Sequence, residues 1–112
     1  MRYIVSILVV YWGLAAVYAP LAVAITTEQY DRINALGRLN GVALHCGYLE
    51  EMRRMKQALI DNLPKRRELG LAFDRLTNES YLDFIKRAED CPRESTFASE
   101  VKKAIQLLKD SF

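Results

Sequence analysis

The sequence predicts an all-α protein: a small bundle of four to five helices closed by one disulfide, after an N-terminal signal peptide. Three observations lead to this prediction. Helix-forming residues dominate residues 25–112, and no stretch shows the alternation of Val, Ile and Thr that is typical of strands. The chain begins with an apolar, uncharged segment. Finally, its 112 residues hold two cysteines, Cys46 and Cys91.

The N-terminal segment, residues 1–24, has the order of features found in secretory signal peptides. Arg2 supplies one positive charge, residues 3–25 carry none, and Ala22 and Ala24 place small side chains before a cut after Ala24. We therefore expect a bacterial protein that is periplasmic or secreted. The alternative is an inner-membrane anchor formed by residues 3–25, since this length spans a hydrocarbon core of ~30 Å.

The remaining residues, 25–112, are expected to form a single helical domain. Thr26 and Gln29 have the spacing of a capping box, which predicts a helix that begins at Thr26 or Thr27. Gly37 and Gly41 lie one turn apart in this helix, which indicates close approach of a second helix, with a local break of the helix as the alternative. A second helical segment is expected over Tyr48–Leu63.

Three further helices are expected after that segment. Pro64 should occupy the first turn of a helix over Lys65–Leu76, because proline fits that position. Thr77-Asn78 should break the chain before a short helix over Glu79–Ala88. Ser95 should cap a last helix whose apolar residues recur at three- and four-residue steps.

The two cysteines are expected to form one disulfide, because exported chains mature under oxidising conditions. A Cys46–Cys91 bond closes a loop that the chain-entropy model values at ~4 kcal/mol. A redox-active pair is disfavoured by the absence of Cys-x-x-Cys spacing. A metal site with His45 is disfavoured because adjacent helical residues point ~100° apart. We therefore expect no metal and no cofactor.

Charge and motifs exclude several classes of function. The chain has 16 Lys and Arg against 14 Asp and Glu, and this near-balance argues against nucleic acid as a partner. It contains no Gly-x-Ser-x-Gly elbow and no Gly-rich phosphate loop. Its one histidine, His45, is expected to lie half-buried beside a helix seam. The sequence therefore predicts a protein that is not an enzyme.

A cluster of basic residues lies in the second helical segment and directly after the proline. Three consecutive cations in a first helical turn oppose the macrodipole, which prefers anions there by ~0.3–1 kcal/mol per charge. The cluster is therefore a candidate partner-binding patch. The alternative is a solvated face in which Glu50 pairs with Arg53 or Arg54, and Asp61 with Lys65. The patch consists of Arg53, Arg54, Lys56, Lys65, Arg66 and Arg67.

In general build the chain is similar to the small periplasmic immunity proteins that block cell-wall amidase toxins. The likeness is one of architecture, so no functional residue follows from it. We expect a non-enzymatic protein that binds a partner protein in the cell envelope as an inhibitor, immunity factor or accessory subunit. Membrane contact is expected only through an uncleaved signal segment. The alternative is a helical carrier of a lipid or other small apolar ligand, lined by Met52, Met55, Phe73 and Phe84.

Overall fold

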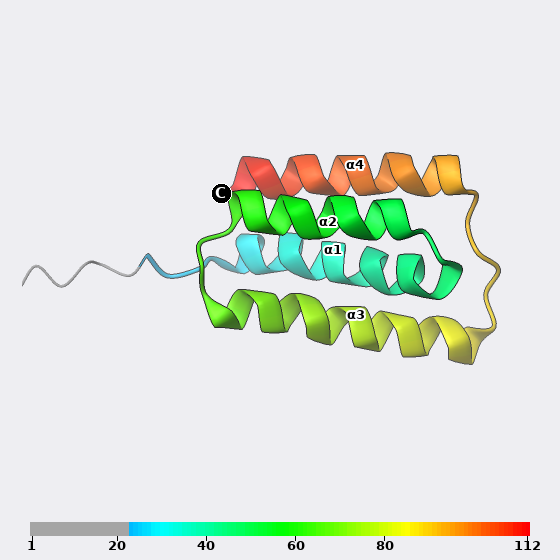
Figure 1. The fold of residues 1–112 in the computed structure, drawn as a ribbon. Helices are drawn as coiled ribbons and strands as arrows, with labels where there is room; N and C mark the ends of the chain where they lie inside the picture. The colour runs from blue at the N-terminus through cyan, green and yellow to red at the C-terminus, as the bar shows by residue number, and fades with distance from the viewer. Residues whose placement is uncertain (1–22) are drawn as a thin grey trace, which may run out of the picture.

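The structure is a computed structural model that describes residues 23–112. Over this range the chain forms four α-helices and no strands (Figure 1). The predicted signal sequence and its alternative, the membrane anchor, fall almost entirely on residues 1–22, which lie outside the described residues. None of the described helices is both long and apolar enough to span a membrane. The helices are α1 (Thr27–Cys46), α2 (Leu49–Asn62), α3 (Arg67–Arg87) and α4 (Glu94–Ser111).

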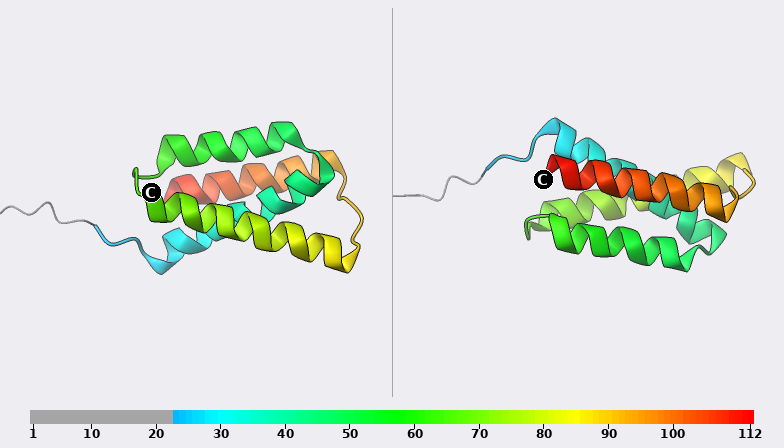
Figure 2. Two further views of the ribbon diagram at one scale, coloured as in Figure 1. Left: turned by 60° about the horizontal axis from the view of Figure 1, so that its bottom comes forward. Right: turned by 90° about the horizontal axis from the view of Figure 1, so that it is seen from above.

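Successive helices run in opposite directions, so α1 and α3 are parallel to each other, as are α2 and α4 (Figures 1 and 2). The backbone of α3 comes close only to that of α1, whereas α1, α2 and α4 all contact one another. Helix α1 is therefore the centre of the bundle. All four helices contribute to the core, which is formed by Ile33, Leu36, Ala43, Met55, Ala58, Leu69, Ala72, Phe73, Phe97, Val101 and Leu108.

Both ends of α1 are fixed by local backbone chemistry. The amide of Gln29 donates to Thr26 Oγ1 over 3.1 Å, and the amide of Thr26 donates to Gln29 Oε1 over 2.9 Å. These bonds confirm the predicted capping box. At the other end Gly47 adopts a φ of 73°, the left-handed conformation that glycine enters without a steric penalty.

The closest helix contact joins α1 to α3 at two glycines. A Cβ atom at Gly37 would lie 2.9 Å from the carbonyl oxygen of Phe73. A Cβ atom at Gly41 would lie 2.6 Å from the carbonyl oxygen of Thr77 and 2.7 Å from the amide nitrogen of Tyr81. These distances are shorter than real Cβ contacts, so only glycine allows the two backbones to approach this closely. Close helix approach is therefore confirmed as the reason for the glycines, and the alternative of a local break is wrong, because α1 continues through both.

The predicted break at Thr77-Asn78 is wrong, because α3 continues through both residues to Arg87. Thr77 is buried, and its hydroxyl donates within the helix to the carbonyl of Phe73 over 2.9 Å. The same hydroxyl accepts a hydrogen bond from Asn40 Nδ2 of α1 over 3.1 Å. Since its polar group is satisfied inside the helix, the threonine does not compete for backbone groups and end it. Four helices result, within the predicted range.

The predicted starts of α3 and α4 also differ from the structure. Pro64 does not open α3, which begins at Arg67 after a turn in which the Arg66 amide donates to the Pro64 carbonyl over 2.8 Å. Ser95 does not cap α4, because that helix begins at Glu94 and Arg93 occupies the cap position without a side-chain hydrogen bond. In both cases the helix begins at a residue other than the one that Pro64 or Ser95 predicts.

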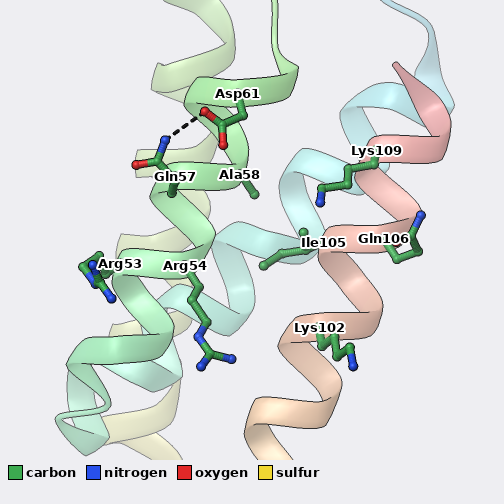
Figure 3. A pocket seen from close by; sticks show the side chains of 9 residues that line it. All are labelled: Arg53, Arg54, Gln57, Ala58, Asp61, Lys102, Ile105, Gln106 and Lys109. Atoms are coloured by element: carbon green, nitrogen blue, oxygen red, sulfur yellow. Dashed lines mark hydrogen bonds between the residues drawn. The ribbon is translucent and has the colours of Figure 1, made fainter.

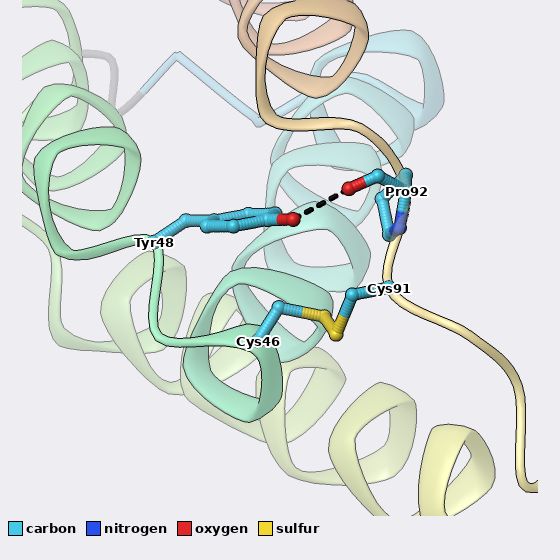
Figure 4. The surroundings of a disulfide bond; sticks show 4 residues. All are labelled: Cys46, Tyr48, Cys91 and Pro92. Atoms are coloured by element: carbon cyan, nitrogen blue, oxygen red, sulfur yellow. Dashed lines mark hydrogen bonds between the residues drawn. A yellow bond between two sulfur atoms is a disulfide. The ribbon is translucent and has the colours of Figure 1, made fainter.

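The predicted disulfide between Cys46 and Cys91 is present, with Cα atoms 5.8 Å apart (Figure 4). It ties the end of α1 to the connection between α3 and α4. Beside it, the Tyr48 hydroxyl donates a hydrogen bond to the carbonyl of Pro92. The Tyr48 ring also packs at 5.4 Å from that of Phe97 in α4. Two bonds and one aromatic contact therefore hold this end of the bundle.

Candidate functional site

A groove of about 420 Å³ lies between the parallel helices α2 and α4 (Figure 3). Figure 3 shows Ile105 and Lys109 pointing from α4 toward α2, and Arg54 on the facing side of α2. Ala58 and Ile105 supply its apolar floor, and longer polar side chains form its rims. We call this feature the α2–α4 groove. It is lined by Arg53, Arg54, Gln57, Ala58, Asp61, Lys102, Ile105, Gln106 and Lys109.

Helical periodicity explains why these side chains meet. On α4, Lys102, Ile105 and Lys109 follow steps of three and four residues, which keep them on one face. On α2, Arg54 and Ala58 are four residues apart and therefore also share one face. Because the two helices are parallel, matching positions lie side by side along the groove. Lys102 and Lys109 are two turns apart, which corresponds to about 10 Å along the helix axis.

The two arginines of the groove both lie near glutamates in the first turn of α2. Arg53 donates to Glu50 through Nη2 over 2.7 Å and through Nε over 3.3 Å. The hydrogen bond from Arg53 lowers the pKa of Glu50 below its ordinary value of 4.5, and the charges of Arg53 and Arg54 act in the same direction. Arg54 lies 3.7 Å from Glu50 and 3.9 Å from Glu51. The solvated-face alternative predicted that Glu50 pairs with Arg53 or Arg54, and the structure shows both contacts.

The lysines of α4 have no such partners. Within residues 23–112, neither Lys102 nor Lys109 has a carboxylate within 4.0 Å. Asp61 is the one carboxylate that lines the groove, and it accepts a hydrogen bond from Gln57 Nε2 over 2.8 Å. The groove thus holds four cations and one carboxylate, whereas the other residues of the described chain hold more carboxylates than cations.

The structure distributes the six residues of the predicted basic patch over several places. Arg53 and Arg54 line the α2–α4 groove. Lys56 lies on the outer side of α2, in a second hollow that includes Leu49 and Ile60. We call this second feature the α2 hollow. Leu49 is 73% exposed and Ile60 is 71% exposed, so apolar side chains face the solvent there.

The remaining patch residues lie at the turn between α2 and α3. Only Arg67 stands in the first turn of α3, so the expected opposition of three cations to the macrodipole is reduced to one. Arg66 lies 4.0 Å from Glu68 and donates to the carbonyl of Val23 over 2.8 Å. Lys65 and Arg66 border a shallow hollow at this turn. No ion pair joins Lys65 to an acidic residue among the described side chains, so its predicted pairing with Asp61 is absent.

Lys102 and Lys109 were not among the residues predicted from the sequence to form a site. Their seven-residue spacing was a usable signal, because it places both on one helix face with Ile105 between them. What periodicity could not supply was the partner helix. Arg54 lines the same groove as these lysines because α2 packs parallel to α4. This pairing of helices is a property of the tertiary structure and cannot be read from the period of one helix.

The single histidine lies apart from the groove. His45 is exposed at the end of α1, and its ring lies 4.9 Å from that of Phe84 and 5.9 Å from that of Tyr81 on α3. The expected place beside the seam of these two helices is confirmed, but the expected half-burial is wrong, because the residue at the end of α1 is exposed. In the part of the chain that the structure describes, no group of three or more His, Cys, Asp or Glu side chains could hold a metal ion.

The four residues named as the lining of an apolar ligand site lie in three different places. Met55 and Phe73 are buried in the core, where they contact other core side chains. Met52 lines the α2 hollow. Phe84 borders a separate hollow between α1 and α3. The described helices thus do not gather these side chains around one cavity.

Comparisons with known proteins add no relative to this description, because no protein-family model, no curated protein and no solved structure matches the chain. The chemistry of the α2–α4 groove and the α2 hollow is therefore the basis for the functional proposal.

Proposed function

We propose that this chain is an exported, non-enzymatic protein that binds a partner protein in the cell envelope, as an inhibitor, immunity factor or accessory subunit. The observation that carries the proposal is the surface formed by α2 and α4. There, unpaired cations of the described chain stand beside exposed apolar side chains, and the two kinds of group occupy adjoining depressions. Exposed apolar side chains that are rimmed by polar residues mark sites of interaction.

The disulfide supports the exported location. A bond between Cys46 and Cys91 persists in oxidising compartments and is rare in the cytosol. The start of the sequence also favours this location, because Arg2 is followed by an apolar segment without charged residues, as in signal peptides. A cut after Ala24 would also remove Val23, which accepts the hydrogen bond from Arg66. Processing would then leave Arg66 with only its 4.0 Å contact to Glu68.

Photo-crosslinking in the producing cells tests the proposal. Benzoylphenylalanine replaces Gln106 at the rim of the α2–α4 groove in one variant and Ile60 in the α2 hollow in another. Leu71, which is exposed on α3, serves as the matched control position. We expect protein adducts at Gln106 or Ile60 and none at Leu71.

Two outcomes would count against the proposal. If neither position gives a protein adduct, the protein does not act by binding a partner through this surface. If all three positions crosslink equally, the contacts are random encounters. Adducts that carry only the mass of a lipid would instead favour the alternative, a carrier of small apolar ligands.

A further inference from the structure

We infer that the α2–α4 groove binds an acidic amphipathic helix of the partner protein, with carboxylates two turns apart facing Lys102 and Lys109. This inference rests on the proposed function and specifies the chemistry of the partner. It is carried by the charges that face the groove and by their spacing.

Three cations of the groove are available to a ligand. Lys102 and Lys109 have no carboxylate within 4.0 Å among residues 23–112, whereas Arg53 is held by Glu50. Arg54 lies at longer distances from its acidic neighbours, 3.7 and 3.9 Å. These three cations can therefore pair with incoming carboxylates without first giving up a short ion pair. A ligand of opposite charge would complement them.

The lysines of α4 are spaced to match a second helix. Lys102 and Lys109 stand seven residues apart on a straight helix, which separates them by about 10 Å along the groove. Carboxylates seven residues apart on a bound helix have the same separation. Ile105 lies between Lys102 and Lys109, and Ala58 lies on α2 at the level of Lys109, so an apolar residue of the bound helix would contact this floor. A helix that lies in a groove between two other helices makes contacts of this kind.

The acidic residue of the groove favours a helix over other anionic ligands. Asp61 lies on α2 beyond the level of Lys109, so this end of the groove is mixed in charge and the end at Lys102 is purely cationic. A uniform polyanion, such as a nucleic acid or a wall polymer, would bring negative charge against Asp61. A flat membrane surface would not reach the floor at Ala58. An amphipathic helix can direct each carboxylate to a cation and leave a neutral residue beside Asp61.

The test compares two double charge reversals in the full chain, each with benzoylphenylalanine at position 106. The first variant carries Lys102→Glu and Lys109→Glu. The control carries Lys103→Glu and Lys86→Glu, which make the same change in charge at exposed residues that do not line the groove. We expect the adduct to fall about tenfold in the first variant and to persist in the control. Sequencing of the crosslinked peptide should find acidic residues seven positions apart.

The inference is overturned if the adduct survives the reversal of Lys102 and Lys109, or if the mapped segment lacks such carboxylates. In that case a protein adduct still supports the proposed function, so the two failures remain distinct. Absence of an adduct in every variant and at Ile60 would overturn both.

A binding measurement with a defined probe adds an independent check. The probe is a synthetic Ala- and Leu-based helical peptide with glutamates seven positions apart, and its control carries lysines instead. We expect the glutamate peptide to shift NMR signals of the groove, and Asp61→Asn to tighten its binding about threefold. Stronger binding to phosphatidylglycerol vesicles than to the peptide, or signal changes away from the groove, would contradict the inference.

Discussion

The Cα atom of Gly41 faces the carbonyl oxygen of Thr77 so closely that a Cβ atom there would lie 2.6 Å from this oxygen. This contact sets the distance between α1 and α3. At this position the addition of a single methyl group should therefore change the stability of the protein.

We predict that Gly41→Ala destabilises the protein although alanine is the better helix former. Overpacking costs about 1–3 kcal/mol, and the clash is with backbone atoms that cannot rotate away. The gain in helix propensity is about 1 kcal/mol. The midpoint of urea unfolding should therefore fall. Gly70, inside α3, has open space within 4 Å of the point where a Cβ atom would stand, so the control Gly70→Ala should raise the midpoint, and a rise in both variants would contradict the packing argument.

The disulfide gives a second prediction. Reduction of the bond between Cys46 and Cys91, which are 45 residues apart, should lower the free energy of unfolding by about 4 kcal/mol. The cause is the greater freedom of the reduced unfolded chain. Chemical unfolding with and without dithiothreitol measures the difference. A variant with both cysteines replaced by alanine should show no response to the reductant, and a response there would point to another cause.

Ala88 ends α3 with a φ of 48°, the left-handed conformation that disfavours residues with a Cβ atom. Gly47 occupies the corresponding position at the end of α1. We predict that Ala88→Gly raises the free energy of unfolding by about 1 kcal/mol and that Gly47→Ala lowers it by a similar amount. Thermal unfolding of both variants measures the changes. Shifts of the same sign would show that backbone conformation is not the cause.

The pair of Glu50 and Arg53 gives a dependence on pH. Because its bond to Arg53 lowers the pKa of Glu50 below 4.5 in the folded protein, the pair stabilises the fold above the unfolded pKa. This contribution is lost as the pH falls through the lowered value. NMR titration of the Glu50 carboxyl should show a midpoint below 4.5 that rises in Arg53→Gln. An unchanged midpoint in that variant would exclude Arg53 as the cause.

Removal of the N-terminal segment has a simple optical signature. Trp12 is the single tryptophan of the chain and lies in the predicted signal sequence. We predict that the protein recovered from the envelope starts at Ile25 and lacks tryptophan emission. Intact-mass measurement gives the cleavage site directly. Retention of the emission, together with the full mass, would favour the membrane-anchor alternative.

The sequence predicted the class of fold, the start of α1 and the disulfide because each depends on local or covalent chemistry. It failed at Thr77, where a buried partner, Asn40, satisfies a side chain that would otherwise favour a break. It also failed at Pro64, because a turn closed by the Arg66 amide and the Pro64 carbonyl comes between this proline and the start of α3 at Arg67. The cationic groove was missed because Arg54 and Lys102 become neighbours only when two parallel helices pack side by side.

The parallel packing of α1 and α3 also orders events in time. These helices are joined by α2, and their hydrogen bond between Asn40 and Thr77 spans 37 residues. Closing a loop of this length is slower than joining adjacent helices, so α2 must reverse the chain before the glycine contact can form. The thiols of Cys46 and Cys91 meet only after that. Oxidation should thus follow folding, so the reduced chain should refold to the same packing, and unfolding rates with and without the bond would measure how far the bond prolongs the native state.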